Sequence, residues 1–306
     1  MKLSLIFIGT GGFGAPVIGS LISSNKFRLP FVITGEDTKA GRSFKLTSSA
    51  IKNCALANNL IVHESRSISA LRQKIMQEKP DFLLVVDFGE IIPEDVLSIA
   101  KIGAVNIHPS LLPKYRGASP LQETILHGDS VTGVSWILMS NKMDAGPIVA
   151  QKRIAVSATD AFYSLSKKLS ALAAKETAGV LSNFAHSPAA QKQDESMATY
   201  CRKITKEDGF IDLHKETAEQ ILRKIRAYEA WPGCFIFWNG KRLKIIQAAT
   251  GEQKISSGMV AAEDGKVLAL GTRKDALLPS VVQPESKCEM RIEEFLRGQK
   301  NIPQRI

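Results

Sequence analysis

The chain has 306 residues, of which 44% are hydrophobic, and this length accommodates one large domain or two modest ones. Its four cysteines are widely spaced and form no CxxC pair, which favours reduced thiols over a disulfide framework or a zinc site. No apolar run approaches the ~20 residues of a membrane-spanning helix. Residues 1–200 carry 21 Lys/Arg against 16 Asp/Glu, and residues 201–306 carry 19 against 14. The net charge of +10 is thus spread along the chain, which favours a polyanionic partner, although a basic protein without one fits equally well.

The first half of the chain alternates apolar runs with helical segments, and this alternation predicts an α/β fold with a Rossmann-like, doubly wound, mostly parallel sheet. The run DFLLVVDFG, residues 81–89, is almost continuously apolar, as expected for a strand buried on both faces. The other expected strands are at residues 2–9, 31–35, 60–65 and 103–108, and the expected helices are at 15–23, 51–59 and 69–79. The last of these helices has apolar residues at Leu71, Ile75 and Met76. The polar segment 36–49 is expected to be a long loop.

The second half begins with two expected strands, at 133–140 and 147–156, joined by a turn around Asp144 and followed by a long helix at 162–184. The small, polar stretch that comes next is typical of a linker. Apolar residues at helical spacing then predict a helix at 216–229. The dipeptides Asn239-Gly240 and Asp264-Gly265 each predict a tight hairpin turn. Successive short strands in this region predict a small β-barrel.

A glycine-rich turn follows the first strand and places Gly9, Gly11 and Gly14 in the GxGxxG pattern of dinucleotide-binding folds. Glu36 and Asp37 lie about where an acid would bind the ribose of such a cofactor. An NAD-dependent oxidoreductase is therefore an alternative function. The same strand, turn and helix also occur in sheets that bind no dinucleotide.

The main candidate site is the pair Asn106 and His108, which lie two residues apart at the end of an expected strand and so share one face of it. Asp144, returned by the next strand, would complete the set. An Asn amide can donate to a developing oxyanion, a His can exchange protons near pH 7, and an Asp can orient that His. The trio has no obvious activated nucleophile beside it, which favours direct acyl transfer or hydrolysis at a carbonyl. On spacing alone, a capping or turn role for His108 stays open.

The segment NIHPSLLPKYRG, residues 106–117, resembles the signature of the formyltransferases that use 10-formyltetrahydrofolate. The resemblance continues in VVDFGEIIP and in TGVSWILMSNKMDAGPI, residues 85–93 and 132–148. Three later segments, CRKITKEDGFIDL, IRAYEAWPG and MRIEEFLRG, are similar to the second domain of the members of this family that act on aminoacyl-tRNA. With both domains, the resemblance covers nearly the whole chain.

The resemblance implies a domain organisation and an activity. It implies a catalytic formyltransferase domain at residues 1–188, a linker at 189–203 and an OB-like, tRNA-binding β-barrel at 204–306. The implied reaction transfers the formyl group of 10-formyltetrahydrofolate to the α-amino group of methionyl initiator tRNA. The implied enzyme is cytoplasmic and monomeric, and needs neither a metal nor a membrane.

The resemblance also implies roles for individual residues. Asn106 and His108 would donate to the formyl oxygen, while Asp144 would hold His108 and help to remove a proton from the attacking amine. The residues expected to bind the folate are Phe88, Gly89, Ile91, Ser110, Leu111, Leu112 and Pro113. The residues expected to bind tRNA are Lys39, Arg42, Lys45, Arg223 and Lys241. A core position for the two leucines, and a solvated position for each basic residue, remain open.

Two departures from the family pattern stand out. The first turn of the family usually reads GTP followed by an acid, and here Gly11-Gly12 replaces the last two of these residues, so that any contact by an acid at position 12 is lost or moved. Asp87-Phe88 stands where the family often has Ala-Tyr, and Asp87 would either contact the pterin or face solvent.

A sugar-nucleotide N-formyltransferase and a catalytically inactive RNA-binding module remain alternatives. Trp231 is expected in the core or between domains.

Overall fold

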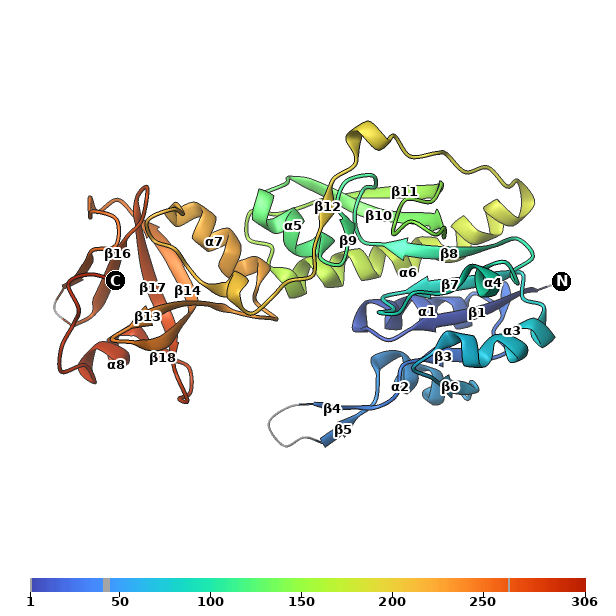
Figure 1. Cartoon of the computed structure of the whole chain (residues 1–306), viewed down its shortest axis with the longest axis horizontal. Coiled ribbons are helices and arrows are strands. Elements are labelled where there is room, and N and C mark those ends of the chain that lie inside the picture. The colour runs from blue at the N-terminus through green and yellow to red at the C-terminus, as the bar shows by residue number, and fades with distance from the viewer. Residues whose placement is uncertain (1, 41–44, 264) are drawn as a thin grey trace. The chain divides into compact units, whose positions relative to one another are not determined.

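The computed structural model describes residues 2–40, 45–263 and 265–306, and it describes the backbone alone at residues 38–40, 45 and 263. The chain divides into two compact units (Figure 1). The first unit comprises Met1–Pro120, Val131–Ala155 and Ser166–Cys201, and the second comprises Leu121–Ser130, Val156–Leu165 and Arg202–Ile306. Among the described residues, no helix combines the length and the apolar character that crossing a membrane requires.

The first unit is built on an eight-stranded mixed sheet in the order β11-β10-β8-β7-β1-β3-β6, with β2 paired to β1. The strands from β8 to β6 run parallel, whereas β10 and β11 are antiparallel to their neighbours. The strands are β1 (Leu3–Gly9), β2 (Phe27–Arg28), β3 (Val32–Thr34), β6 (Val62–Glu64), β7 (Phe82–Val86), β8 (Gly103–His108), β10 (Val131–Leu138) and β11 (Ile148–Ala155). This arrangement confirms the Rossmann-like sheet that the alternating pattern predicts.

The centre of this sheet is buried on both faces, which explains its continuous apolar runs. All five residues of β7 are buried, as are the last six of the seven in β1. The chain leaves β1 toward β3 and β6 on one side and returns on the other side through β7 and β8. The carboxyl ends of β1 and β7 therefore form a topological switch point, where open α/β sheets bind their ligands.

Helices accompany this sheet, and the long helix α6 runs alongside β8, β10 and β11 (Figure 1). The helical segments are η1 (Gly12–Gly14), α1 (Ala15–Ser23), α2 (Ala50–Ala57), η2 (Ile68–Leu71), α3 (Arg72–Glu78), α4 (Glu94–Leu97) and α6 (Phe162–His186). The buried indole of Trp136 on β10 donates to Thr177 Oγ1 at 3.0 Å, and Ser170 Oγ donates to the Phe13 carbonyl at 2.6 Å. These two buried bonds fix α6 to β10 and to the turn after β1.

Three expectations for the first unit need correction or detail. The segment 36–49, expected to be a loop, contains the antiparallel pair β4 (Thr38–Ala40) and β5 (Lys45–Thr47). Met76 is 42% exposed, whereas Ile75, the preceding residue of α3, is buried. The stretch expected to be a linker contains η3 (Glu195–Met197) and β12 (Tyr200–Cys201), which pairs with β9 (Arg116–Gly117). The domain boundaries given above remain predictions.

The second unit holds a six-stranded antiparallel sheet in the order β13-β14-β17-β16-β15, with β18 paired to β17. Its strands are β13 (Cys234–Trp238), β14 (Lys241–Gly251), β15 (Val260–Glu263), β16 (Val267–Gly271), β17 (Ala276–Pro284) and β18 (Met290–Arg291). Its helical segments are α5 (Pro120–His127), of which Pro120 belongs to the first unit, η4 (Glu207–Gly209), α7 (Ala218–Ala227) and α8 (Ile292–Arg297). Helix α7 begins with a capping box between Thr217 and Gln220.

The turn signals of the second unit have different outcomes. Asn239 and Gly240 adopt φ angles of 48° and 77° and form the predicted two-residue turn between β13 and β14. In the hairpin of β15 and β16, Glu263 pairs with Val267, so three residues lie between the strands, and Asp264 is outside the described residues.

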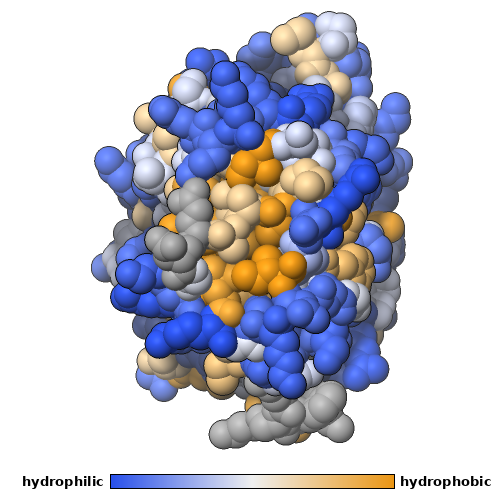
Figure 2. Space-filling model, turned by 90° about the vertical axis from the view of Figure 1, so that its left-hand side faces the viewer, coloured by the Kyte–Doolittle hydropathy of each residue, from blue (hydrophilic) through white to orange (hydrophobic). Residues whose placement is uncertain are grey.

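Trp231, expected in the core or between domains, is 51% exposed. A view onto this unit shows apolar side chains gathered in the middle of one face and surrounded by hydrophilic ones (Figure 2).

Candidate active site

The structure brings together the three residues of the candidate site. Asn106 and His108 lie on the same face of β8 near its end, while Ile107 points to the opposite face. Asp144 lies on the turn between β10 and β11. Its Oδ1 accepts from Asn106 Nδ2 at 3.3 Å, and its Oδ2 lies 3.6 Å from Nδ1 of His108. A single carboxylate therefore contacts both the amide and the imidazole.

The ring of His108 is 4% exposed, and both of its nitrogens face protein atoms. Nε2 lies 2.8 Å from the carbonyl oxygen of Tyr115. Because a carbonyl only accepts, Nε2 carries a proton in this arrangement and Nδ1 faces Asp144. His108 can thus donate to a substrate oxygen only if Nε2–H exchanges the Tyr115 carbonyl for that oxygen.

Asn106 is the more accessible donor. Its side chain is half-buried, and one N–H of its amide is bound to Asp144. The other N–H has no partner among the described residues, so it is free to donate to an oxygen that enters the site. The arrangement can therefore stabilise negative charge on a carbonyl oxygen through Asn106 and, after the exchange, through His108.

Asp144 is itself held in an unusual backbone conformation. Its φ angle is 52°, in the left-handed region that few residues other than glycine adopt. Its Oδ2 accepts from the backbone N–H of Gly117 at 2.9 Å, which ties the turn to the loop after β8. This bond fixes the orientation of the Asp144 side chain.

Gln193 supports this turn, and sequence reasoning missed it because it lies in the stretch expected to be a linker. Its side chain is 5% exposed. Its amide donates to the carbonyls of Asp144 at 2.8 Å and Gly146 at 2.7 Å, and its oxygen accepts from Nε and Nη2 of Arg116. Arg116, 1% exposed, also forms an ion pair with Glu195 at 2.9 Å. Arg116 therefore has a structural role.

The loop after β8 contains four of the residues expected to bind the folate. Ser110 and Leu112 are buried, whereas Leu111 and Pro113 are half-buried. Ser135 on β10 holds this loop, because its hydroxyl accepts from the Leu112 N–H at 3.1 Å and donates to the Ser110 carbonyl at 2.6 Å. The buried side chains of Ser110 and Leu112 thus shape the loop from inside, and Leu111 and Pro113 are the two with exposed surface.

The loop after β7 contains the other three. Phe88 packs partly buried against the core, Gly89 is exposed, and Ile91 is 87% exposed. Ile91 thus exposes an apolar side chain on the loop after β7, at the carboxyl end of a central strand.

Asp87 begins this loop and lies directly against Gly11. A Cβ atom on Gly11 would come 1.4 Å from Oδ2 of Asp87, whereas a Cβ on Gly12 would meet nothing within 4 Å. Asp87 is exposed, but neighbouring protein atoms desolvate its carboxyl group and raise its pKa. The switch point between β1 and β7 therefore carries a carboxyl group that comes from β7.

The residues that suggested a dinucleotide site are engaged within the protein. Glu36 forms an ion pair with Arg66 at 2.7 Å, and Asp37 forms one with Lys52 at 2.9 Å. A side chain on Gly9 would meet the carbonyl of Val86 at 2.3 Å, so this glycine serves the packing of β1 against β7.

The basic residues expected to contact tRNA fall into different groups. Lys39 lies on β4 and Lys45 lies on β5, and the structure describes only the backbone of these two residues. Arg42 lies outside the described residues. Lys241 is exposed next to the β13–β14 turn. Arg223 is half-buried, forms an ion pair with Glu219 and donates to the carbonyl of His127.

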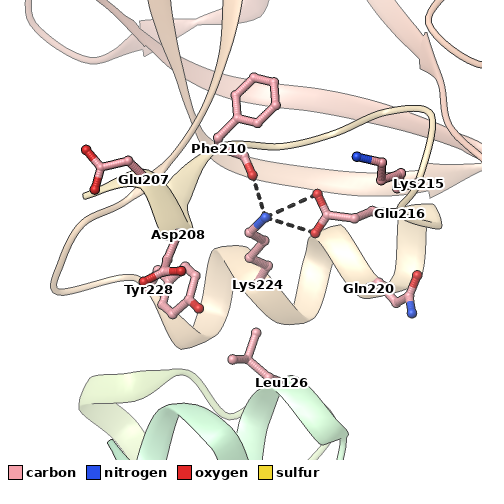
Figure 3. A pocket seen from close by; sticks show the side chains of 9 residues that line it. All are labelled: Leu126, Glu207, Asp208, Phe210, Lys215, Glu216, Gln220, Lys224 and Tyr228. Carbon is pink, nitrogen blue, oxygen red and sulfur yellow. Dashed lines mark hydrogen bonds and ion pairs between the residues drawn. The ribbon is translucent and has the colours of Figure 1, made fainter. Parts of the chain in front are cut away.

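The second unit has a hollow of about 470 Å³ beside α7 (Figure 3). Its charged groups are largely satisfied within the unit. Lys224 contacts both carboxylate oxygens of Glu216, and Arg202 binds Asp208 and lowers the pKa of that carboxyl to about 2. Within the described part of the chain, no group of three or more His, Cys, Asp or Glu side chains is placed to hold a metal ion.

Comparison with known families gives a match along both parts of the chain. The formyl transferase family matches residues 1–181, and the family described as the formyl transferase C-terminal domain matches residues 203–300. A methionyl-tRNA formyltransferase from Ehrlichia ruminantium (strain Gardel) is 38% identical over 301 residues, which cover 97% of each chain. One from Sulfurimonas denitrificans is 34% identical over 304 residues, again 97% of each chain.

Solved structures share the fold at lower identity. HypX from Aquifex aeolicus in complex with tetrahydrofolic acid superposes with a TM-score of 0.65 at 17% identity, over 97% of this chain and 47% of its own. The sugar 3N-formyltransferase WlaRD superposes with a TM-score of 0.65 at 18% identity, over 94% of this chain and 100% of its own.

The first prediction concerns Gly11 and Gly12. Gly11→Ala should force the Asp87 carboxylate to move and lower the free energy of unfolding by about 1–2 kcal/mol, measured by urea denaturation. Gly12→Ala is the matched control and should be neutral or stabilise by up to about 1 kcal/mol. In an Asp87→Ala background, Gly11→Ala should lose most of its effect. Equal effects of the two alanines in the natural background would contradict the contact.

The second prediction concerns the titration of Asp87. Its folded pKa lies above its ordinary value, so between these two values the folded state binds more protons than the unfolded state, and stability falls as the pH rises. Asp87→Asn should remove this fall, so the variant should gain stability relative to the natural protein as the pH rises through this window. Urea denaturation at a series of pH values measures the effect, with Glu90→Gln as the control. Parallel pH profiles for Asp87→Asn and the natural protein would refute it.

The third prediction concerns Gln193. Gln193→Ala leaves two carbonyls without this partner and removes one of the acceptors of Arg116, which keeps Glu195, and should lower the free energy of unfolding by about 2–4 kcal/mol. Gln191→Ala removes the same side chain from an exposed position two residues away and should cost less than about 0.5 kcal/mol. A similarly small effect at Gln193 would show that the turn around Asp144 does not need this support.

Proposed function

The chain belongs to the formyl transferase family, and from this premise we propose how its residues carry out the reaction. It is a formyl-transferring enzyme that moves the formyl group of 10-formyltetrahydrofolate to the α-amino group of methionyl initiator tRNA. The observation that carries this function is the match, over 97% of both chains, to relatives that are methionyl-tRNA formyltransferases. Similarity to sugar formyltransferases is confined to the fold.

The reaction forms a bond between the amine nitrogen and the formyl carbon, breaks the bond from that carbon to the folate nitrogen, and moves one proton from the amine to the folate. Negative charge grows on the formyl oxygen as the amine attacks. The free N–H of Asn106 donates to this oxygen, a contribution of about 3–4 kcal/mol for one such donor. Removal of Asn106 therefore affects the transition state more than the binding of either substrate.

His108 and Asp144 act as a unit in this proposal. Nε2–H of His108 turns from the Tyr115 carbonyl to the formyl oxygen as the substrate enters, while Nδ1 keeps its contact with Asp144. The carboxylate orients the imidazole and, through water, accepts the proton that the amine loses. Two distances support this assignment. Nε2 of His108 lies 2.8 Å from the Tyr115 carbonyl, which a substrate oxygen can replace as its acceptor, and Nδ1 lies 3.6 Å from the Asp144 carboxylate, which takes part in the reaction.

The folate-binding role is proposed for the loops after β7 and β8. The exposed side chain of Ile91 and the half-buried Leu111 and Pro113 provide an apolar surface, and Gly89 leaves backbone groups open to the pterin. The residues fit a flat heterocycle whose edge carries donors and acceptors.

The second unit is proposed to bind the tRNA, as an OB-like barrel in a monomeric, cytoplasmic enzyme. The excess of basic residues in 201–306 supports this role. The long strand β14, whose register shifts twice along β17, supports a curved and closing sheet.

Formyl transfer tests the function directly. The natural protein is given 10-formyltetrahydrofolate with charged methionyl initiator tRNA, uncharged tRNA or an amino-sugar nucleotide as acceptor. We expect transfer to the charged tRNA alone. Transfer to the amino-sugar alone would keep the catalytic trio and overturn the tRNA substrate.

The fourth prediction concerns the trio. Asn106→Ala, His108→Ala and Asp144→Ala should each reduce kcat by at least ~100-fold, because each removes a group that acts in the transition state. The dissociation constant for tRNA should change little, and binding measurements on each variant provide the control. Near-normal turnover in all three variants would remove these assignments.

A further inference from the structure

One face of the β13–β14 hairpin combines aromatic and basic side chains. Phe235 pairs with Lys244 and Phe237 pairs with Arg242, so these four side chains project from the same face. The opposite face carries Ile236 and other apolar residues that pack into the core of the unit. The run CFIFW therefore does not lie wholly in the core.

Phe210 joins the two phenylalanines of this face into a cluster of three rings. The ring centroids lie 5.9 Å apart for Phe210 and Phe235, 6.0 Å for Phe210 and Phe237, and 5.8 Å for Phe235 and Phe237. The guanidinium of Arg242 lies over the Phe235 ring at 4.4 Å from its centroid. Phe235 is buried by its neighbours, whereas Phe210 is 40% and Phe237 46% exposed.

The position of Phe210 is fixed by its backbone. Phe210 forms a parallel bridge with Phe235, and the next N–H, of Ile211, donates to the Phe235 carbonyl at 2.9 Å. Lys224 on α7 donates to the carbonyl of Phe210, and the ring points away from this contact (Figure 3). The rings are thus held before any ligand arrives, which reduces the entropy that binding would cost.

A hollow of about 400 Å³ lies beside the two exposed rings. Phe210 and Phe237 form part of its wall, together with His214 and the segment that precedes it. Asp212 in this wall is paired with Lys215 at 3.1 Å, so its charge is compensated. A flat group that stacks on an exposed ring would find an open space there and cationic side chains next to it.

We propose that Phe210, Phe235, Phe237 and Arg242 form a platform on which an unpaired nucleobase of the tRNA stacks; this inference rests on the proposed function. A base offers a π face to the phenylalanine rings, and the adjoining phosphates offer negative charge to Arg242 and Lys244. An apolar peptide or an uncharged lipid surface would match the rings but would leave these cations unused. The platform therefore favours single-stranded nucleic acid over both.

The test compares Phe237→Leu, which keeps an apolar side chain but loses the ring, with Phe237→Trp, which keeps a ring. The full-length protein is titrated with uncharged initiator tRNA, and the dissociation constant is measured by fluorescence anisotropy at several salt concentrations. Phe237→Leu should weaken binding roughly 5- to 150-fold, as expected for the loss of one stacked base, without a change in the salt slope. Phe237→Trp should bind within about 3-fold of the natural protein, because its ring provides the same stacking. Ile302→Ala, at another exposed apolar position of the same unit, should leave the affinity unchanged.

A second measurement separates bases from phosphates. The dissociation constants of a single-stranded RNA hexamer and of an abasic chain of the same length are measured for the natural protein and for Phe237→Leu. The natural protein should bind the hexamer more tightly than the abasic chain, and Phe237→Leu should largely lose this preference. The platform is overturned if Phe237→Leu binds tRNA normally, if Phe237→Trp is as weak as Phe237→Leu, or if the abasic chain binds as well as the hexamer. If the natural protein prefers the hexamer but transfers no formyl group, the proposed function fails and the platform stands.

Discussion

The carboxylate of Asp144 is the group on which the geometry of the site depends. It contacts the amide of Asn106, the imidazole of His108 and the backbone N–H of Gly117. Hydrogen bonds to a charged group contribute about 1.5–3 kcal/mol each, and a buried partner left alone costs as much again. One carboxylate thus contacts Asn106 and His108, which lie two residues apart on β8, and also the loop that contains Gly117. The amide of Asn106 is thus in place before substrate binds, as stabilisation of a developing oxyanion requires, whereas His108 must first release the Tyr115 carbonyl.

The carboxylate can serve in this way only because its backbone is held in place. A non-glycine residue with a φ angle of 52° costs free energy, and it persists where the surroundings determine it. Gln193 supplies this constraint by binding the carbonyls on both sides of Ala145, while its own oxygen is held by Arg116. The stretch that includes Gln193 is therefore part of the site. The side chain of Gln193 joins the structural Arg116 to the turn that carries Asp144, so the stability of this region and the position of Asp144 depend on one side chain.

The sequence predicts best what depends on short spacing. The shared face of Asn106 and His108 follows from the period of a strand, and the turn at Asn239-Gly240 follows from the conformations those two residues favour. The role of Gln193 cannot be read in this way, because its burial depends on Arg116, which lies far away in sequence. The exposure of Phe237 could not be predicted from the sequence for another reason. The run CFIFW is apolar throughout, and only the contact with Phe210 shows which of its faces lies outside the core.

The two departures from the family pattern lie next to each other in the structure. Asp87 follows β7, and Gly11 follows the neighbouring strand β1, so their side chains would compete for the same space. Any Cβ at position 11, including that of the proline usual in the family, would lie 1.4 Å from the Asp87 carboxylate as it stands. Glycine at position 11 therefore leaves open the space that the Asp87 carboxylate occupies in this structure. Because Gly12 carries no side chain, the carboxyl group at this switch point comes from the loop after β7 instead of the loop after β1.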